Sequence, residues 1–141
     1  ISITTDIIIG FPGETEEDFR HTFELFEFAE FDMSYIFKYW PPPGTPSFEM
    51  KDDVTPEEKT RRFLELEKLQ KLSQSKALNR LLNKTVEVLA EKKSNKNELE
   101  LSGHTTCHKV VNFKGLGDDL GRLKMVRVSE VKANTLYGVA T

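Results

Sequence analysis

Two runs of β-branched and aromatic residues flank a helical pattern in the first part of the chain. Residues 2–9 are rich in Ile and Thr and stop at a Gly-Phe-Pro-Gly turn, which predicts a buried strand. Residues 33–39 predict a second strand, so that strand, helix and strand form one parallel βαβ unit. A lone unit cannot bury both faces of its sheet. We therefore expect the first residue to lie inside a strand of a longer chain, with the missing strands upstream.

A helix is predicted over about 16–30, between these strands. Thr15 precedes Asp18 by three residues, as in a capping box, and the acidic first turn suits the positive end of a helix dipole. Its apolar residues recur at spacings of three and four, in Phe19, Phe23 and Phe26, with Leu25 on the flank. One face of this helix is therefore expected to be buried.

A second helix is predicted after a proline-rich loop. Three consecutive prolines remove backbone donors and fix φ, so residues 40–46 are a loop. Thr55, Pro56 and Glu58 then have the residue types of an N-cap and of the first and third helical positions. The helix is expected to reach residue 82. It has an apolar stripe of Phe63, Leu66, Leu69 and Leu72, with Arg61, Arg62, Lys68 and Lys71 mostly outside it.

The pattern changes after Asn83 to short β-like runs separated by Asn, Gly and Asp. The five predicted strands are Thr85–Ala90, Glu98–Leu101, Cys107–Phe113, Lys124–Val131 and Thr135–Ala140. So many short strands favour a small barrel of the OB type, because closure protects strand edges. The expected fold class is α/β plus all-β, with a domain boundary near residue 83 that separates residues 1–83 from residues 84–141.

Charge is distributed unevenly along the chain. The net charge is -3, but residues 1–53 contain 3 Lys/Arg against 12 Asp/Glu, whereas residues 84–141 contain 10 against 7. The C-terminal part is therefore the better candidate for binding a polyanion. An excess this small also fits ordinary solvated lysines, and charge alone leaves both interpretations open.

Cysteine and histidine usage excludes several kinds of site. A single cysteine, Cys107, allows no internal disulfide and suits a reducing compartment, so a cytoplasmic protein is expected. No segment resembles a signal peptide or reaches membrane-spanning length. Cys107 is interpreted as a small apolar strand residue. His21, His104 and His108 lack the spacing of a metal site, so no protein metal ligand is predicted.

The turn after the first predicted strand is the most informative motif. Gly10 and Gly13 would let backbone lie close to a ligand at the carboxyl end of a parallel strand, where α/β barrels have their active sites. The same glycines would also suit a plain strand-to-helix turn. The acidic residues that follow, Glu14 among them, fit either acid–base chemistry or stabilisation of the helix N-terminus.

Residues 5–15 closely resemble the motif D-x-I-x-G-F-P-G-E-T of the methylthiotransferase family of radical S-adenosylmethionine enzymes. The fixed positions of that motif are Asp6, Ile8, Gly10, Phe11, Pro12, Gly13, Glu14 and Thr15. A second family loop, Y-S-x-R-x-G-T-x-A, is matched at Tyr39, Gly44 and Thr45 but not at Trp40, Pro42 or Ser47. The usual arginine is therefore replaced, while the resemblance as a whole extends over the entire chain.

The C-terminal part resembles the TRAM module, a small β-barrel associated with RNA-modifying enzymes. Gly103-His104-Thr105 stands where Gly-Arg-Thr is common, so a cation that titrates near neutrality replaces a permanent one. The segment from Val110 to Phe113 is similar to the branch of the family that acts on tRNA.

The resemblance implies a fold and two cofactors. The fold is the C-terminal part of a partial α/β barrel, preceded in the family by another α/β domain and followed by the TRAM barrel. The family holds a 4Fe-4S cluster through a C-x-x-x-C-x-x-C trio, and one cysteine cannot supply three ligands. This chain alone is therefore expected to bind neither cluster nor S-adenosylmethionine and to contain no catalytic residue. The residues expected in the S-adenosylmethionine wall are Asp6, Ile8, Gly10, Phe11, Pro12, Gly13, Glu14 and Tyr39, with Glu14 in a structural or positioning role.

The resemblance also implies tRNA as the partner and a monomeric full-length enzyme. That enzyme would cleave S-adenosylmethionine reductively and replace a C–H bond by C–S–CH3 on an isopentenyl-adenosine next to the anticodon. If Val111 and Phe113 point into the barrel, strand alternation turns their neighbours outward. The RNA-binding residues expected are His104, His108, Asn112, Lys114 and Arg127.

Two alternatives stay open at this point. A sibling methylthiotransferase would share the first motif and modify a ribosomal-protein aspartate or a threonylcarbamoyl-adenosine in tRNA. A non-catalytic RNA-binding module would need only the C-terminal barrel. A three-cysteine motif encoded upstream of Ile1 would favour an enzyme, and its absence would favour the binding module.

Overall fold

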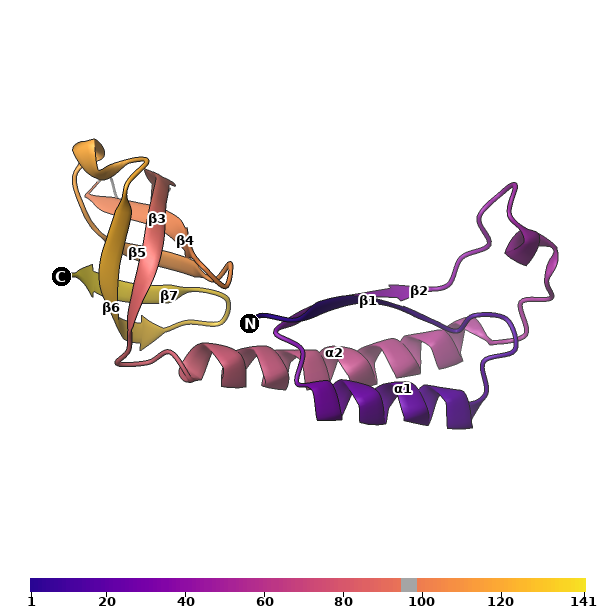
Figure 1. Cartoon of the computed structure of the whole chain (residues 1–141). Helices are drawn as coiled ribbons and strands as arrows, with labels where there is room; N and C mark the ends of the chain where they lie inside the picture. Colours follow the sequence, from indigo (N-terminus) through magenta and orange to yellow (C-terminus); the bar gives the residue numbers. More distant parts are fainter. Residues whose placement is uncertain (95–98) are drawn as a thin grey trace. The chain divides into compact units, whose positions relative to one another are not determined.

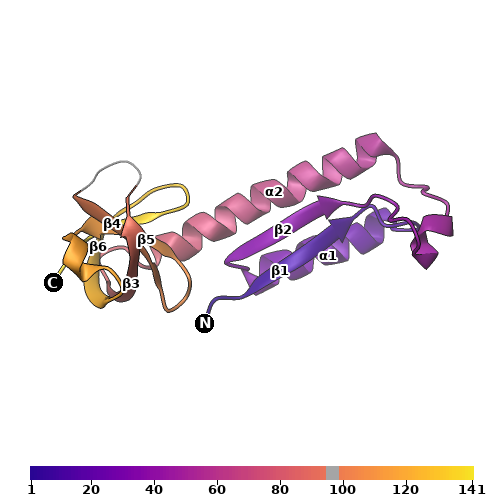
Figure 2. The ribbon, with the colours of Figure 1, turned by 90° about the horizontal axis from the view of Figure 1, so that it is seen from above.

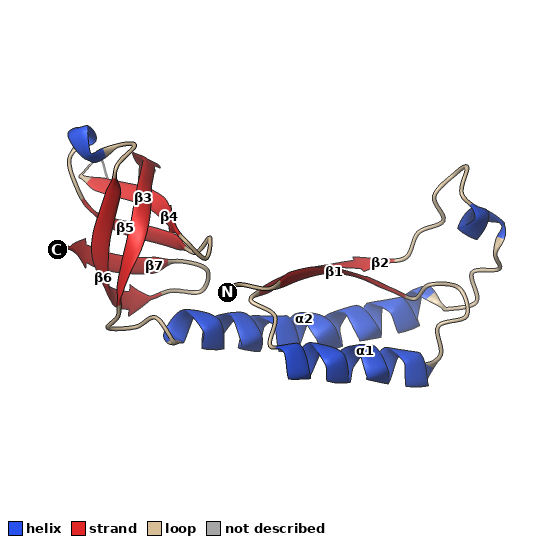
Figure 3. Cartoon of the chain, in the orientation of Figure 1, coloured by secondary structure: helices blue, strands red, loops and turns tan. Residues whose placement is uncertain are grey.

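The computed structural model describes residues 1–94 and 99–141, which form two compact units. The first unit comprises residues 3–73, and the second comprises residues 74–141 together with Ile1 and Ser2. Figures 1 and 3 show the α/β arrangement of the first unit and the β-barrel of the second. The division falls within helix α2 (Pro56–Asn79), upstream of the boundary predicted near residue 83. Neither helix α1 nor α2 of the described residues is long and apolar enough to cross a membrane.

The first unit contains the predicted parallel βαβ arrangement. Strand β1 (Thr4–Ile9) pairs in parallel with β2 (Met33–Lys38), and helix α1 (Glu16–Ala29) connects them. The Thr15 hydroxyl accepts the Asp18 N–H, and the Asp18 carboxylate accepts the Thr15 N–H. This reciprocal pair confirms the predicted capping box, which satisfies two donors at the start of the helix.

One face of the β1–β2 sheet packs on the helices. Ile9, Phe19, Phe26 and Leu66 are fully buried and form the centre of this core. Figure 2 shows the two strands running alongside α1 and the first turns of α2. The core therefore rests on the apolar faces that helical periodicity predicts.

Strand β1 differs from its prediction in its start and its burial. It begins at Thr4, so the first residue does not lie inside a strand. Its side chains alternate, and Ile8 is 57% exposed while Ile9 is buried. The prediction of a buried strand over residues 2–9 is thus wrong for this chain, because within the described residues the helices cover only one face of the sheet.

Helix α2 has the predicted N-cap but a shorter extent. Thr55 Oγ1 accepts the N–H of Glu58 at 3.2 Å, whereas the helix ends at Asn79 and a turn follows it. Leu72, predicted in the buried stripe, is 61% exposed. Leu72 follows Phe63 by nine residues, which is two and a half turns at about 3.6 residues per turn, so the two side chains lie on opposite faces of the helix.

The second unit is a closed five-stranded barrel with the strand order β3-β4-β5-β7-β6. Strands β5 and β7 are parallel, and the other neighbouring pairs are antiparallel. A small closed barrel of the OB type was predicted, and the closure confirms it. The strands are β3 (Thr85–Lys93), β4 (Glu100–Thr105), β5 (Val110–Lys114), β6 (Leu123–Val131) and β7 (Leu136–Ala140). Two short 3-10 helices, Pro46–Glu49 in the first unit and Gly117–Asp119 in this one, complete the elements.

Strand alternation in the barrel follows the prediction, with one local exception. Val111, Phe113, Val126 and Val128 point inward and are buried. However, β5 starts at Val110, so Cys107 and His108 are not strand residues as predicted. They lie in the connection from β4 to β5, where the His108 N–H donates to the Thr105 carbonyl at 2.8 Å and His108 has a left-handed φ of 59°. A tight reversal between antiparallel strands requires such a residue. Glu98, predicted to begin a strand, lies outside the described residues.

Candidate functional site

The turn after β1 is closed by two carboxylates of the chain itself. Gly10 and Gly13 have left-handed φ values of 70° and 85°, which favour glycine. The Gly10 N–H donates to Glu14 Oε2 at 2.5 Å, and the Gly13 N–H donates to Asp53 Oδ1 at 2.8 Å. Both N–H groups are therefore satisfied within the chain, and the two glycines form the strand-to-helix turn.

Glu14 connects this turn to α2. Its Oε2 accepts a second hydrogen bond from Arg62 Nη1 at 2.6 Å, and its carbonyl accepts another from the same guanidinium at 3.1 Å. The Glu14 and Arg62 side chains are only 12% and 5% exposed. Arg62 also donates to Glu58 Oε1 at 3.0 Å. A carboxylate held by two donors suits the structural role expected of Glu14 better than proton transfer.

The sequence pattern did not identify Arg62 as a buried partner. Helical periodicity placed the α2 cations mostly outside the apolar stripe, and Arg62 is instead enclosed against the turn after β1. A neighbouring cation, Arg61, joins the two helices through Glu16, Glu58 and Glu65. The hydrogen bond from Arg61, followed by that from Arg62, lowers the pKa of Glu58 to about 2.

A cavity of about 300 Å3 lies beside the end of β1 and the residues after β2. Ile8, Phe11 and Tyr39 of the predicted cofactor wall line it. Three further apolar residues line it that the sequence pattern did not indicate, and these are Phe37, Trp40 and Pro42. Phe37 could have been found from alternation, because it pairs with Ile8 in the parallel register.

Tyr39 is held rigidly in this wall. Its hydroxyl donates to the Ser47 carbonyl at 2.9 Å, and the Phe11 ring meets it edge to face with centroids 5.1 Å apart. Lys59 Nζ donates to the Tyr39 carbonyl at 3.3 Å and pairs with Asp52 at 2.7 Å. An aromatic, preformed wall of this kind suits a flat heteroaromatic ligand.

The remaining predicted wall residues do not line the cavity. Asp6 is exposed on the same face of β1 as Ile8, and Pro12 is buried in the turn. The structure thus divides the predicted set into lining residues (Ile8, Phe11, Tyr39), turn residues (Gly10, Pro12, Gly13, Glu14) and the separate Asp6.

His104 and His108 lie together on the barrel surface. Their rings stack with centroids 4.4 Å apart, and His104 Nδ1 lies 2.6 Å from Glu91 Oε2. A shallow cavity of about 220 Å3 beside them also includes Glu87. Two carboxylates so close make this side of the barrel less attractive to phosphate groups than the predicted histidines alone imply.

Asn112, Lys114 and Arg127 occupy another part of the barrel surface. Lys114 and Arg127 are exposed on the strands on either side of β7. Arg127 pairs with Val139 of β7. The adjacent β7 residue, Gly138, pairs with Phe113, which precedes Lys114. Asn112 also turns outward but is 9% exposed, so it lines a pocket instead of projecting into solvent.

Residues 1–94 and 99–141 contain no cluster of potential metal ligands. No group of three or more His, Cys, Asp or Glu side chains in these ranges could hold a metal ion. Cys107, the one cysteine of the sequence, lies in the turn between β4 and β5. A cluster that needs three thiolates does not fit the residues of this chain.

Comparison with known proteins matches both units. Residues 79–141 match the TRAM domain. The chain is 43% identical over 138 residues, 98% of its length, to a tRNA-2-methylthio-N(6)-dimethylallyladenosine synthase of Bacillus velezensis, of which it covers 27%. It is 41% identical over 139 residues to the synthase of that name from Erwinia tasmaniensis. That match covers 99% of the chain and 29% of the relative. For the synthase of Photorhabdus laumondii the identity is 44% over 141 residues, with 98% of the chain and 29% of the relative covered.

The chain therefore spans less than a third of the length of these curated relatives. The similarity extends across the βαβ unit as well as the barrel, since the matched region includes nearly every residue. Over nearly its whole length the chain is accordingly similar to these tRNA-2-methylthio-N(6)-dimethylallyladenosine synthases, and its residues 79–141 match the TRAM domain.

Proposed function

We propose that the chain is part of a tRNA methylthiotransferase that adds a methylthio group to isopentenyl-adenosine next to the anticodon. In this proposal the first unit belongs to a larger radical S-adenosylmethionine barrel, and the TRAM barrel binds tRNA. The observation that carries the proposal is the identity of 41–44% to three dimethylallyladenosine synthases across both units. A binding module related only through its barrel would be similar over residues 79–141 alone, whereas these relatives match 98–99% of the chain.

The residues of the first unit fit one of the two implied cofactors. The cavity of about 300 Å3 has apolar and aromatic walls at the carboxyl ends of two parallel strands, where α/β folds bind their ligands. Ile8, Phe11 and Tyr39 would contact S-adenosylmethionine there, and Glu14 with Arg62 would hold the turn that positions Phe11. When bound, S-adenosylmethionine supplies the radical chemistry that replaces C–H by C–S–CH3.

The 4Fe-4S cluster would be held elsewhere in the full-length protein. Cys107 is the one cysteine of this sequence, and it lies in the TRAM barrel, separate from the cavity-lining residues of the first unit. We assign no catalytic residue to this chain, whose own residues position the cofactor and bind the RNA.

The TRAM barrel would supply the electrostatic attraction for tRNA. Lys114 and Arg127 are exposed on the strands that flank β7, and such cations bind phosphates without regard to sequence. The proposed partner is tRNA in the cytoplasm, with the full-length enzyme acting as a monomer.

The experiment that tests this proposal is mass spectrometry of tRNA nucleosides from cells with and without the full-length gene. We expect the methylthio-isopentenyl-adenosine to disappear on deletion and to return on complementation. An unchanged level of this nucleoside, with loss of a methylthiolated threonylcarbamoyl-adenosine or of a methylthiolated ribosomal aspartate, would assign the chain to a sibling enzyme instead. No change in any methylthio product would leave only the RNA-binding module.

A further inference from the structure

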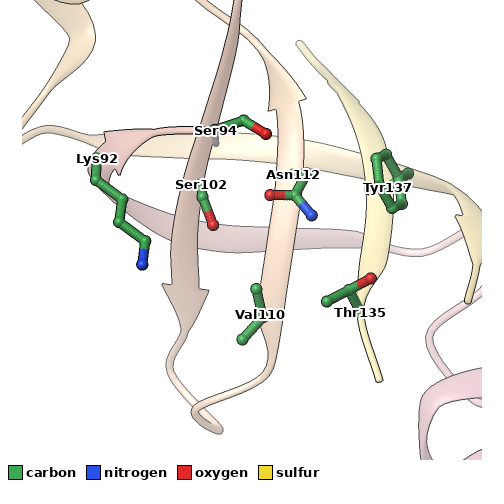
Figure 4. Close-up of a pocket in the computed structure, with 7 residues that line it drawn as sticks. All are labelled: Lys92, Ser94, Ser102, Val110, Asn112, Thr135 and Tyr137. Atoms are coloured by element: carbon green, nitrogen blue, oxygen red, sulfur yellow. The ribbon is translucent and has the colours of Figure 1, made fainter. Parts of the chain in front are cut away.

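A row of polar side chains crosses four strands on the outer surface of the TRAM barrel. The register pairs Lys92 of β3 with Ser102 of β4, Ser102 with Asn112 of β5, and Asn112 with Tyr137 of β7. Figure 4 shows the Asn112 amide between the Ser102 hydroxyl and the Tyr137 ring, in a pocket that Thr135 also lines. Neighbours in register on one sheet face lie side by side, so these groups converge on one site.

The central side chains of this row open onto the pocket without a hydrogen-bond partner among the described residues. Ser102 and Asn112 are 8% and 9% exposed. Neither side chain forms a hydrogen bond with another residue in the described part of the chain, and no side-chain N or O atom there is both buried and without a partner, so their polar atoms are open to solvent. Polar atoms that face solvent in a pocket can exchange their water for a ligand with matching groups. The pocket therefore offers an amide donor, an amide acceptor and a hydroxyl to a ligand.

The shape and the flanking charges indicate the kind of ligand. The cavity is about 220 Å3, smaller than the roughly 300–1,000 Å3 of pockets that enclose drug-sized molecules, so it suits one flat ring system. Tyr137 borders it, and Lys132 Nζ lies 4.0 Å from the centre of the Tyr137 ring. Lys92 lies at the other end of the row. A lysine at each end would place one phosphate on each side of a bound ring.

We propose that this pocket binds one unpaired nucleobase of an RNA, which the Asn112 amide reads through hydrogen bonds while Tyr137 packs against it. Unpaired RNA bases are recognised in this way, by aromatic contact and by hydrogen bonds to their edges. A free phosphate or carboxylate fits less well, because the centre of the pocket carries an acceptor as well as donors and no cation. This inference rests on the proposed RNA-binding role of the barrel.

The test compares two RNA pentamers that differ by one base. Both carry the same fluorescent label and the same phosphates. The first has five bases, and the second lacks only the central base. Binding to the full-length protein is measured by fluorescence anisotropy for wild type, Asn112→Ala, Tyr137→Phe and Tyr137→Leu. Thr85→Ala, an exposed residue at the start of β3, is the matched control.

We expect the wild type to bind the complete pentamer about tenfold more tightly than the abasic one, because a stacked and hydrogen-bonded base contributes affinity of that order. Asn112→Ala and Tyr137→Leu should abolish this difference without weakening binding of the abasic pentamer. Tyr137→Phe and Thr85→Ala should keep it. Asn112→Ala should also leave the thermal midpoint unchanged, because no hydrogen bond of the described chain is lost.

The outcomes separate this inference from the proposed function. Equal affinity of the wild type for both pentamers, with tRNA still bound, overturns the base pocket alone. Equal weakening of both pentamers by Asn112→Ala overturns it too, since the residue then acts on the fold or on phosphates. Failure of the wild type to bind tRNA or either pentamer overturns the RNA-binding role of the barrel itself.

Discussion

The carboxylate of Glu14 and the guanidinium of Arg62, 48 positions apart in the sequence, form a buried ion pair with an N–O distance of 2.6 Å. The same carboxylate oxygen accepts the N–H of Gly10, so one ion pair fixes both the turn after β1 and its contact with α2. A motif glutamate thus holds the backbone of the turn beside the candidate cavity.

Removal of Arg62 should destabilise the first unit strongly. Arg62→Ala leaves the Glu14 carboxylate buried without its cation, a change that costs about 3–5 kcal/mol in comparable buried pairs. The free energy of unfolding is measured by urea denaturation, followed by circular dichroism at the helical band. Arg20→Ala is the control, because Arg20 makes ion pairs of similar length but is 43% exposed and should cost about 1 kcal/mol or less. Equal losses for the two variants would show that burial of the Glu14 pair is unimportant.

Acid should weaken the fold partly through Glu58. Its pKa is about 2 in the folded chain, chiefly because of the hydrogen bond from Arg61, against an ordinary value of 4.5. A lowered folded pKa adds stability that is complete above the unfolded value and is lost as the pH falls through the folded one. The thermal midpoint should therefore fall between about pH 5 and pH 2, and less steeply in Glu58→Gln. Parallel curves for the two proteins would contradict this assignment. Some slope should remain, since hydrogen bonds from Thr15 and Lys124 also lower the pKa values of Asp18 and Asp119.

Gly103 should tolerate no side chain. A Cβ at this position of β4 would overlap the carbonyl oxygen of Leu89 on the neighbouring strand β3, and backbone cannot move aside cheaply. We expect Gly103→Ala to lower the barrel's free energy of unfolding by at least about 1–3 kcal/mol. Gly117→Ala is the matched control, because nothing lies within 4 Å of a Cβ there and the change should be neutral or slightly stabilising. A Gly103→Ala barrel as stable as the control would mean that β3 and β4 are farther apart than described.

Lys114 and Arg127 should contribute to tRNA affinity through phosphates. For the full-length enzyme we expect Lys114→Ala with Arg127→Ala to weaken tRNA binding and to flatten its salt dependence. Each lost phosphate contact reduces the slope of log affinity against log salt by about 0.7–0.9. Titrations at several salt concentrations measure that slope, with Lys68→Ala plus Lys71→Ala on α2 as the charge-matched control. Reductive cleavage of S-adenosylmethionine should be unaffected. A folded double variant with an unchanged slope would place the RNA on another face.

Local signals predicted most of the secondary structure, because caps and alternation depend on neighbours in sequence. The Thr15 cap, the Thr55 cap and the inward pair Val111 and Phe113 are examples. The strand assigned to Cys107 and His108 was wrong, since residue types that favour strands gave no sign of the tight reversal after Thr105. Local composition does not specify where a chain must turn to close a barrel.

Long-range partners were the part that sequence could not supply. Helical periodicity predicts the face of α2 on which Arg62 lies. The burial of its guanidinium depends on Glu14, which lies in the turn after β1. The outward direction of Asn112 followed from alternation, whereas its enclosure between Ser102 and Tyr137 depends on the registers of three strands. Residue types were therefore informative about candidate sites, and pairing between distant segments determined which residues meet there.

The closure of the barrel has a consequence for how it opens. Each of its five strands has hydrogen-bonded neighbours on both sides, so none can separate without breaking two ladders. Amide protons of β3 to β7 should therefore exchange with solvent as one cooperative set, at a rate governed by global opening of the barrel. The stacked pair His104 and His108, the exposed cations Lys114 and Arg127, and the pocket around Asn112 would then be lost together. The surface that holds them persists only while the ring of strands is complete.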